Sequence, residues 1–244
     1  DDEDPVIVNL PDRVTVPTEP GICEGTTSWT DPDTSDNCGV AALEVSVDSG
    51  SMLPVGETVV VYTVIDIHGN SSSQSFIVTV EDQELPQIID APADIAVSND
   101  LDQCGATINW TEPSASDNCG IQSFTSSSTS GDFFGIGTVE VVLTATDIYG
   151  NEQNASFLVT VTDDQDPQIL GLPLDITVSN DPGLCGASVS WTEPTASDNC
   201  DDVSLDASHQ PGDFFPVGST DVFYTAVDIY GNVFSDKFKV IVVD

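Results

Sequence analysis

An internal repeat of 81 residues is the feature that most limits what this chain can fold into. The cysteines at positions 23, 104 and 185 are 81 residues apart, and so are Trp29, Trp110 and Trp191. No insertion or deletion separates the copies. Repetition at a fixed period indicates one structural unit used several times. We therefore predict three domains of one kind, over residues 1–81, 82–162 and 163–244.

The last residue, Asp244, falls on the first position of a further copy, in register with Asp1, Asp82 and Asp163. We expect that the sequence is cut from a longer array or joins end to end with further copies of the same repeat.

The hydrophobic pattern inside each repeat has a period of two. In the middle copy, Val139, Val141 and Leu143 alternate with residues of the opposite face, as in a strand with one buried side. Short strands with turn signals about every 8–12 residues are typical of immunoglobulin-like sandwiches. We predict an all-β fold, three tandem immunoglobulin-like β-sandwich domains in an extended array, with the three tryptophans as core anchors. The strands expected in the middle copy are 94–98, 106–111, 120–126, 138–146 and 154–161.

The charge is extreme, because 42 acidic residues face three basic ones and the net charge is −39. Such a surface repels nucleic acids and anionic membranes and attracts cations, divalent ones in particular. No apolar run approaches the ~20 residues of a membrane span. We therefore expect no nucleic-acid partner and no membrane insertion.

Six cysteines predict disulfides and an oxidising, extracellular location, secreted or on the cell surface. Zinc is disfavoured because no Cys-x-x-Cys pair occurs. The simplest pairing lies within each repeat, although a strand between the two cysteines would carry them ~23 Å apart unless the chain turns back. Pairing across repeats remains the alternative. The within-repeat pairs are Cys23–Cys38, Cys104–Cys119 and Cys185–Cys200, and the cross-repeat pairs are Cys23–Cys119 and Cys104–Cys200.

An ordered set of motifs resembles tandem hyalin repeats (HYR domains). It consists of GLCGASVSWTEPTASDNC at 183–200, FPVG at 215–218 and DIYGN at 228–232, with counterparts in the other repeats. The resemblance implies an extracellular protein associated with adhesion. Many members of that family carry a second cysteine pair, which is absent here.

The acidic residues gather at the boundaries between repeats and in two loops, the Asp-Asn-Cys loop and the Asp-x-x-Gly-Asn turn. If the strands alternate in direction, these segments meet where the chain enters each sandwich. Ca²⁺ takes 6–8 oxygen ligands. We predict that Ca²⁺ binds there and stiffens the array, much as in cadherin-like tandem domains. The candidate ligands are Asp1, Asp2, Asp4, Asp36, Asp66, Asp82, Glu84, Asp117, Asp147, Asp163, Asp164, Asp166, Asp198 and Asp228.

Simpler explanations exist for the same acids. An aspartate of the Asp-x-x-Gly-Asn turn can cap the turn backbone, and the Asp-Asn-Cys aspartate can do the same. A surface rich in acid can also be an adaptation to salt, without any specific site.

Catalysis is not expected, because the acids recur identically in every repeat and no nucleophile or nucleotide motif is present. We expect a structural or adhesive protein of a stalk or filament. The alternative is an adhesin module that binds a cell-surface glycan or protein.

Overall fold

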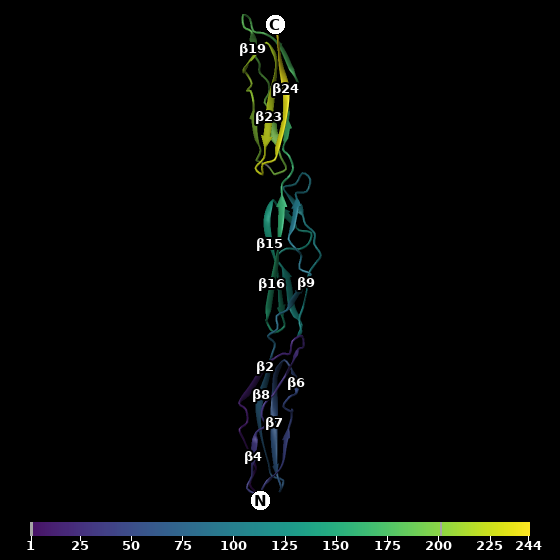
Figure 1. Ribbon diagram of the computed structural model, residues 1–244, viewed down its shortest axis with the longest axis vertical. Helices are drawn as coiled ribbons and strands as arrows, with labels where there is room; N and C mark the ends of the chain where they lie inside the picture. The colour runs from purple at the N-terminus through teal and green to yellow at the C-terminus, as the bar shows by residue number, and fades with distance from the viewer. Residues whose placement is uncertain (1, 201) are drawn as a thin grey trace. The chain divides into compact units, whose positions relative to one another are not determined.

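The computed structural model describes residues 2–200 and 202–244 (Figure 1), and in these residues all regular structure is β-strand. The chain divides into two compact units. The first consists of Asp1–Ala91, Glu112–Ser127 and Val142–Ser156, and the second of Pro92–Thr111, Ser128–Val141 and Phe157–Asp244.

The first unit contains the whole first repeat, which forms a four-stranded sheet of order β2-β8-β7-β5 and the two short pairs β1-β4 and β3-β6. In the sheet, β2 runs parallel to β8, and the other neighbours are antiparallel. The strands that lie wholly in the first unit are β1 (Val6–Val8), β2 (Arg13–Pro17), β3 (Glu24–Thr26), β4 (Asp33–Ser35), β5 (Val40–Val45), β6 (Met52–Pro54), β7 (Gly56–Asp66), β8 (Ser71–Glu81), β9 (Gln87–Ile89), β12 (Ser114–Ser116) and β13 (Ile121–Ser126).

Side-chain alternation places the core on one face of this sheet. Val60, Tyr62 and Val64 of β7 are buried, whereas Val59, which directly precedes Val60, is 57% exposed. Trp29 lies edge-on against Phe76 of β8, with ring centroids 5.3 Å apart. The period of two read from the sequence therefore defines the buried face.

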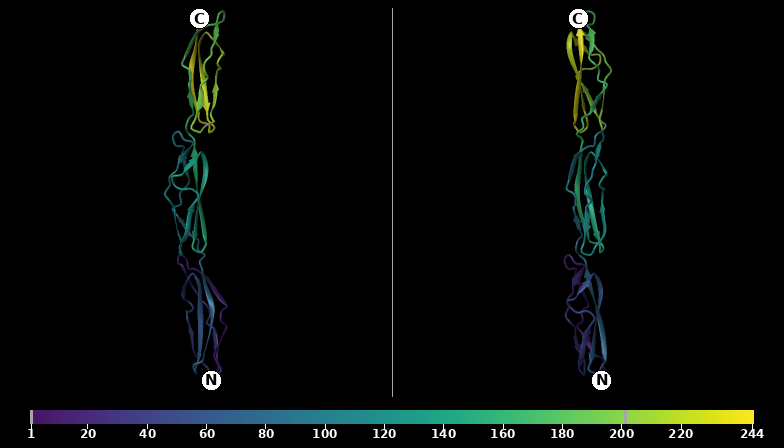
Figure 2. Two further views of the ribbon diagram at one scale, coloured as in Figure 1. Left: turned by 180° about the vertical axis from the view of Figure 1, so that it is seen from behind. Right: turned by 90° about the vertical axis from the view of Figure 1, so that its right-hand side faces the viewer.

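The second unit repeats this arrangement in the third repeat, with the sheet order β18-β24-β23-β21 and the pairs β17-β20 and β19-β22. The long hairpin β23–β24 lies beside the shorter strands of its own repeat (Figure 2). Its strands are β10 (Ile95–Ser98), β11 (Gly105–Thr107), β14 (Phe133–Gly135), β17 (Gln168–Leu170), β18 (Ile176–Ser179), β19 (Gly186–Ser188), β20 (Thr195–Ser197), β21 (Ser204–Ala207), β22 (Phe214–Pro216), β23 (Gly218–Val227) and β24 (Val233–Val243); β15 (Gly137–Asp147) and β16 (Glu152–Thr162) run through both units.

The prediction of tandem β-sandwiches is confirmed, but one predicted strand is too long. The strand expected at 106–111 is β11, which ends at Thr107. Beyond it, the Ile108 N–H donates to the Asp132 carbonyl, and the backbone N–H and carbonyl of Trp110 bond to the Ser130 hydroxyl. Backbone bonds of Ile108 and the Ser130 side chain therefore replace a regular strand ladder here. The Trp110 ring lies against Phe157 with ring centroids 5.3 Å apart.

Candidate metal centre

The disulfides join neighbouring repeats. Cys23 bonds Cys119 and Cys104 bonds Cys200, each pair 96 residues apart in the sequence with a Cα–Cα distance of 4.7 Å. Cys38 and Cys185 are free and exposed. The preferred prediction of pairing within each repeat is therefore wrong, and the cross-repeat alternative is correct.

The two cysteines of one repeat cannot meet because they lie at opposite ends of one of its two longest strands. In the first repeat, the loop of Cys23 begins where Thr18 N–H bonds the Glu81 carbonyl, at the end of β8. Cys38 lies next to Gly39, whose carbonyl accepts from Ile67 in the turn before β8. The eleven residues of β8 span about 36 Å at ~3.3 Å per residue, far beyond the reach of a disulfide.

Two equivalent clusters surround these disulfides. We call the first junction the cluster of Cys23, Asp82 and Asp117–Cys119, and the second junction the cluster of Cys104, Asp163 and Asp198–Cys200. Each junction lies inside one of the two compact units. Each combines a boundary aspartate that follows the last strand of one repeat with the Asp-Asn-Cys loop of the next.

Asp82 is the buried centre of the first junction, with only 8% of its surface exposed. Its Oδ1 accepts hydrogen bonds from the Thr18 hydroxyl (3.2 Å), the Glu84 N–H (3.2 Å) and the Asn118 amide (3.3 Å). Its Oδ2 is buried and has no hydrogen-bond partner among the described residues. A buried carboxylate oxygen without a donor is costly unless a cation or a water compensates it.

The Asp-Asn-Cys loop adds two more oxygens of this kind. Asp117 Oδ2 accepts from the N–H groups of Cys119 (2.8 Å) and Gly120 (3.2 Å), which leaves Asp117 Oδ1 buried and unpaired within the described part of the chain. Asn118 donates its amide to Asp82 and to the Ile22 carbonyl (3.3 Å), and its own Oδ1 is buried and unpaired in the same way. Three buried acceptor oxygens without donors therefore belong to this one junction.

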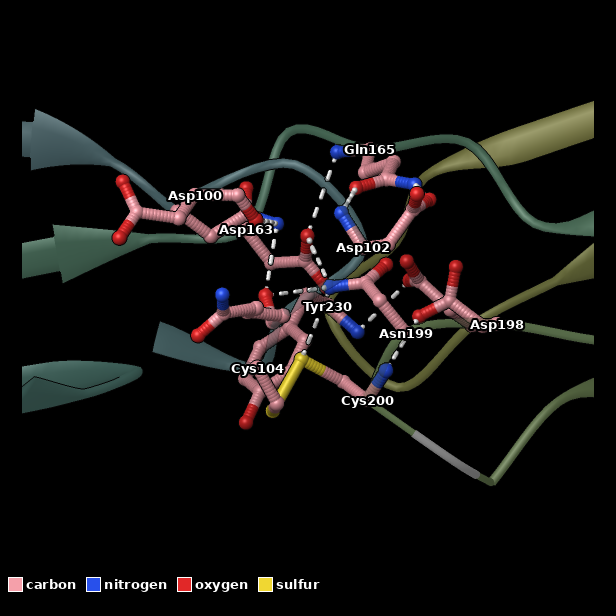
Figure 3. The surroundings of a disulfide bond; sticks show 12 residues. Asp100, Asp102, Cys104, Asp163, Gln165, Asp198, Asn199, Cys200 and Tyr230 are labelled. Carbon is pink, nitrogen blue, oxygen red and sulfur yellow. Dashed lines mark hydrogen bonds between the residues drawn. A yellow bond between two sulfur atoms is a disulfide. The ribbon is translucent and has the colours of Figure 1, made fainter. Parts of the chain in front are cut away.

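The second junction repeats this geometry (Figure 3). Asn199 donates to Asp163 Oδ1 (3.3 Å) and to the Gln103 carbonyl (3.0 Å), and Asp198 Oδ2 accepts from the Cys200 N–H (2.9 Å). Asp163 Oδ2, Asp198 Oδ1 and Asn199 Oδ1 are buried without a partner in the residues that the structure describes. Because equivalent oxygens are unpaired at both junctions, the unpaired oxygens are a feature of the repeat and not of one junction.

Ligand-capable atoms lie close enough together to share one ion. One ligand atom each of Asp82, Asp117 and Cys119 lies within 4.8 Å of the others, and the same holds for Asp163, Asp198 and Cys200. The cysteine sulfurs are already used in the disulfides, so the ligand atoms that remain are hard oxygens. None of the three basic residues of the chain belongs to either junction. The arrangement therefore suits a hard divalent cation.

The turn aspartates Asp66, Asp147 and Asp228 are nearly or fully buried and cap their own turns. Asp147 Oδ1 accepts from the N–H groups of Tyr149 and Asn151, both at 2.8 Å, and Asp147 Oδ2 from the Asn151 amide at 2.6 Å. Burial raises the pKa of these carboxyls, but the hydrogen bonds from the asparagine and the turn backbone outweigh it, so that each pKa lies below its ordinary value.

The turns reach the junctions through their asparagines. The Asn151 amide also donates to the Asp82 carbonyl, and the Asn232 amide to the Asp163 carbonyl, each at 3.2 Å. The expected meeting of three segments at the entry of each sandwich is thus confirmed for the second and third repeats, with the turn contributing an amide.

The remaining predicted ligands lie outside the clusters of unpaired oxygens. Asp2 and Asp4 are exposed, and Asp1 lies outside the described residues. Glu84 accepts from the Gly21 N–H, and exposed Asp164 accepts from the Ser98 hydroxyl. Asp166 lines a cleft beside Asp198. Asp36 makes the same contacts in its own Asp-Asn-Cys loop as Asp117 does, because its Oδ2 accepts from the N–H groups of Cys38 and Gly39. Its Oδ1 is buried and unpaired among the described residues.

Sequence reasoning missed the asparagines, because only carboxylates were counted as ligands. Asn118 and Asn199 stand in the repeated Asp-Asn-Cys triplet, and Asn151 and Asn232 end the repeated turn pentad. Their recurrence at 81 residues was the signal available. An asparagine carbonyl oxygen is an ordinary Ca²⁺ ligand.

A model of one protein family, the HYR domain, matches residues 1–80, 81–161 and 162–242. The chain belongs to the HYR domain family. The matches cover nearly all of the chain and follow its sequence repeats, and the HYR resemblance noted in the sequence is therefore confirmed.

Curated relatives of this HYR chain include two proteins named hyalin. Hyalin of Strongylocentrotus purpuratus is 34% identical over 255 residues, with 100% of this chain and 21% of that protein covered, and hyalin of Lytechinus variegatus is 34% identical over 252 residues, with 100% and 48% covered. The chain thus spans about a fifth and about half of their lengths. A sushi, von Willebrand factor type A, EGF and pentraxin domain-containing protein of Rattus norvegicus is 35% identical over 160 residues, 62% of this chain and 4% of that protein.

Among solved structures, the protocadherin gammaB7 EC3-6 cis-dimer shares 18% identity and a TM-score of 0.34, with 100% of this chain and 78% of that chain covered. Drosophila N-cadherin EC1-4 shares 15% identity and a TM-score of 0.32, with 100% and 76% covered.

The family, the curated relatives and the two disulfides together identify an extracellular repeat module. No helix in residues 2–200 and 202–244 is long and apolar enough to cross a membrane.

Proposed function

We propose that this chain is a structural and adhesive component of an extracellular stalk or filament, in which Ca²⁺ bound at the junctions stiffens the connection between successive repeats. The domains of this array are residues 1–81, 82–162 and 163–244. The observation that carries the proposal is the proximity of two carboxylates in each junction, each with a buried and unpaired oxygen, beside an asparagine whose oxygen is also buried and unpaired. These residues are Asp82, Asp117 and Asn118, repeated by Asp163, Asp198 and Asn199.

The chemistry of these oxygens favours Ca²⁺ over other biological cations. Zn²⁺ prefers nitrogen and sulfur ligands, and the nearby sulfurs are held in disulfides. Mg²⁺ demands a regular octahedron, whereas Ca²⁺ accepts irregular sets of carboxylate, amide and carbonyl oxygens with water in the remaining places. Extracellular modules typically bind Ca²⁺ with a Kd of about 0.1–1 mM, which is the range expected here.

A cation at a junction would tie two repeats together, because its ligands come from both. Asp82 follows the last strand of the first repeat, whereas Asp117 and Asn118 belong to the second. In the absence of a cation, two carboxylates of equal charge lie within a few ångströms of each other and repel. Binding would therefore remove a repulsion and add a bond at the same place.

A role in catalysis does not fit these sites. The acids serve the same structural purpose at both junctions, and the disulfide beside each one leaves no free thiol there. We infer a protein whose function lies in the connections between its repeats.

Calorimetric titration with CaCl₂ and thermal unfolding in CaCl₂ or EDTA test the proposal. We expect two bound ions per chain. At a free concentration a hundred times Kd, each ion adds about 2.7 kcal/mol to the free energy of unfolding of the part it holds together. NaCl at equal ionic strength controls for screening of the surface charge.

The double variant Asp82→Asn, Asp163→Asn should abolish the response to Ca²⁺. Asp164→Asn is the control, and Asp163→Asn alone matches it in charge, because each removes one negative charge. Asp164 is a boundary carboxylate that is exposed and bonded to Ser98. If melting in EDTA and in CaCl₂ coincides, or if Asp164→Asn weakens binding as much as the double variant does, the proposed sites are wrong.

A further inference from the structure

A cleft in the third repeat lies apart from both junctions. It has a volume of about 460 Å³ and is lined by residues of the short strands β20 and β21, with Tyr224 of β23 in its wall. None of the residues that line it belongs to either junction. Pockets that bind small molecules measure about 300–1,000 Å³, so the cleft is large enough for a ligand of its own.

The wall of this cleft contains a buried hydroxyl group with an unused proton. Tyr224 is only 2% exposed. Its hydroxyl oxygen accepts a hydrogen bond from the Trp191 indole N–H at 2.8 Å. In residues 2–200 and 202–244, no group accepts the hydroxyl proton in return. A buried donor without an acceptor is costly, so this proton favours an acceptor atom that enters the cleft from outside.

The first repeat contains the same tyrosine with its proton already used. Tyr62 accepts from the Trp29 indole N–H at 2.8 Å and donates to Asp31 Oδ1. Glu193 stands at the position of Asp31 two repeats later and lines the cleft, but its longer side chain makes no hydrogen bond to Tyr224 among the described residues. The equivalence indicates that the Tyr224 hydroxyl faces the cleft at the place that Asp31 fills in the first repeat.

The second repeat lacks this hydroxyl group altogether. Leu143 stands at the position of Tyr62 and Tyr224. Within the described part of the chain, the third repeat alone therefore combines the tyrosine hydroxyl with an unfilled acceptor position. A difference of this kind between otherwise similar repeats favours a local role for the third repeat, because a purely structural feature would recur in all three.

Other polar groups around the cleft are also without protein partners. Glu193 and Asp206 are exposed, and the carboxylate of neither one makes a hydrogen bond or an ion pair within the residues that the structure describes. Gln210 uses its backbone N–H to bond Asp213, and its side-chain amide lines the cleft. Two carboxylates and an amide are therefore available to a ligand. Beside them, Pro194, Ala196 and Leu205 provide an apolar surface.

This combination of groups selects the chemistry of the ligand. The tyrosine hydroxyl requires an acceptor atom, whereas the two carboxylates can only accept. A metal ion or an ammonium group has no acceptor atom for the tyrosine. An anionic ligand is repelled by the carboxylates and by the net charge of −39. A neutral sugar meets all the requirements, because its hydroxyl groups both donate and accept and its C–H groups can contact the apolar surface.

We propose that the cleft of the third repeat binds a neutral sugar residue of a glycan, with Tyr224 donating to a sugar oxygen and with Glu193 and Asp206 accepting from sugar hydroxyl groups. The inference rests on the adhesive part of the proposed function and gives it a ligand class. It is independent of the cation sites, because the cleft shares no residue with the junctions.

Binding of the whole chain to a printed array of glycans, carried out in EDTA, tests the proposal. The array holds neutral glycans built from glucose, galactose, mannose and N-acetylglucosamine, and acidic glycans that end in glucuronic acid. We expect binding to neutral glycans and none to the acidic ones. An array without bound protein, or equal binding to both classes, would overturn the proposal. Because EDTA removes cations, this result does not depend on whether Ca²⁺ binds the junctions.

Removal of the tyrosine hydroxyl tests which residue carries the binding. For the neutral glycan that gives the strongest signal on the array, we expect Tyr224→Phe to raise Kd about tenfold, since one buried hydrogen bond is lost. Tyr62→Phe is the matched control, because it removes the equivalent hydroxyl and deprives Trp29 of its acceptor just as the first variant deprives Trp191. The control should leave Kd unchanged. Equal values of Kd for the two variants would contradict the proposal.

Glu193→Asp tests the same site without a change of charge. This variant gives the third repeat the residue that bonds the tyrosine in the first repeat, so its carboxylate should take the Tyr224 proton and raise Kd for that glycan about tenfold. Glu112→Asp, at the equivalent position beside no tyrosine in the second repeat, is the control and should bind like the wild type. If Glu193→Asp also binds like the wild type while remaining folded, the glycan does not use the tyrosine proton and the proposal fails.

Discussion

The side chain of Asn118 donates a hydrogen bond to Asp82 Oδ1 across the boundary between the first and second repeats, while Asn118 Oδ1 and Asp82 Oδ2 remain buried without donors in the described part of the chain. One pair of residues thus both connects two repeats and leaves two buried oxygens without donors. Asn199 and Asp163 repeat the relationship.

Replacing this asparagine should weaken one cation site at a time. Asn118→Ala removes a ligand oxygen and the hydrogen bonds to Asp82 and Ile22, so we expect Ca²⁺ affinity at the first junction to fall about 10–100-fold, with the second junction unchanged. Calorimetric titration should resolve the two sites. Asn37→Ala is the matched control, because the same position in the first repeat belongs to neither junction, and it should leave both affinities intact.

Bound Ca²⁺ should protect the disulfides from reduction. Cys119 adjoins Asn118 in the first junction, and Cys23 and Cys119 are only partly exposed. We therefore expect reduction to require opening of the junction, and a bound cation raises the free energy of that opening. At ten times Kd, reduction of Cys23–Cys119 by dithiothreitol should slow about tenfold. Timed alkylation with mass spectrometry measures this rate. An equal rate in CaCl₂ and EDTA would show that the cation does not hold the junction closed.

The cross-repeat bonds should stabilise more than bonds within a repeat would. A closed loop of about 100 residues is worth about 4.7 kcal/mol in the chain-entropy model, against about 3 kcal/mol for about 15 residues. Cys23→Ser with Cys119→Ser should therefore lower the free energy of unfolding by roughly 4–5 kcal/mol in urea titrations. Peptide mapping without reductant should recover Cys23 linked to Cys119, and recovery of Cys23 linked to Cys38 would refute this pairing.

Tyr62→Phe should destabilise the first repeat. The Trp29 indole N–H donates to the Tyr62 hydroxyl at 2.8 Å. Loss of the hydroxyl leaves this partly buried indole N–H without an acceptor, at a cost of about 1–3 kcal/mol in the free energy of unfolding. Tyr224→Phe should act likewise on Trp191 in the third repeat. Urea unfolding followed by tryptophan fluorescence measures the loss. Tyr149→Phe at an exposed turn is the control and should change little.

The turn aspartates should make stability depend on acidity. Their hydrogen bonds lower the pKa of Asp66, Asp147 and Asp228 in the folded state, so their contribution is complete above the unfolded pKa of ~3.9 and is lost as the pH falls through the lower folded pKa. In EDTA, the difference in stability between wild type and Asp66→Asn should be constant above pH 5 and shrink toward pH 3. A difference that does not change with pH would show that ionisation of Asp66 is unimportant.

The repeat, the all-β fold class and the cation-attracting charge could all be predicted from the sequence, because each depends on the pattern of residue types along the chain. Period-two alternation in 138–146 specifies β15 and its buried face, and the 81-residue recurrence of cysteine, tryptophan and Asp-Asn-Cys specifies three copies of one fold. The meeting of boundary, loop and turn also followed from alternating strand directions.

The disulfide pairing and the choice among the acids were decided by tertiary structure. Sequence proximity favoured Cys23 with Cys38, but β8 separates them by its full length and brings Cys23 to the following repeat. Asp82 and Asp66 are both buried aspartates, yet Asp66 has both oxygens bonded within its turn and Asp82 keeps one unpaired. Which oxygen lacks a donor depends on residues brought together from different repeats, and that information exists only once the chain is folded.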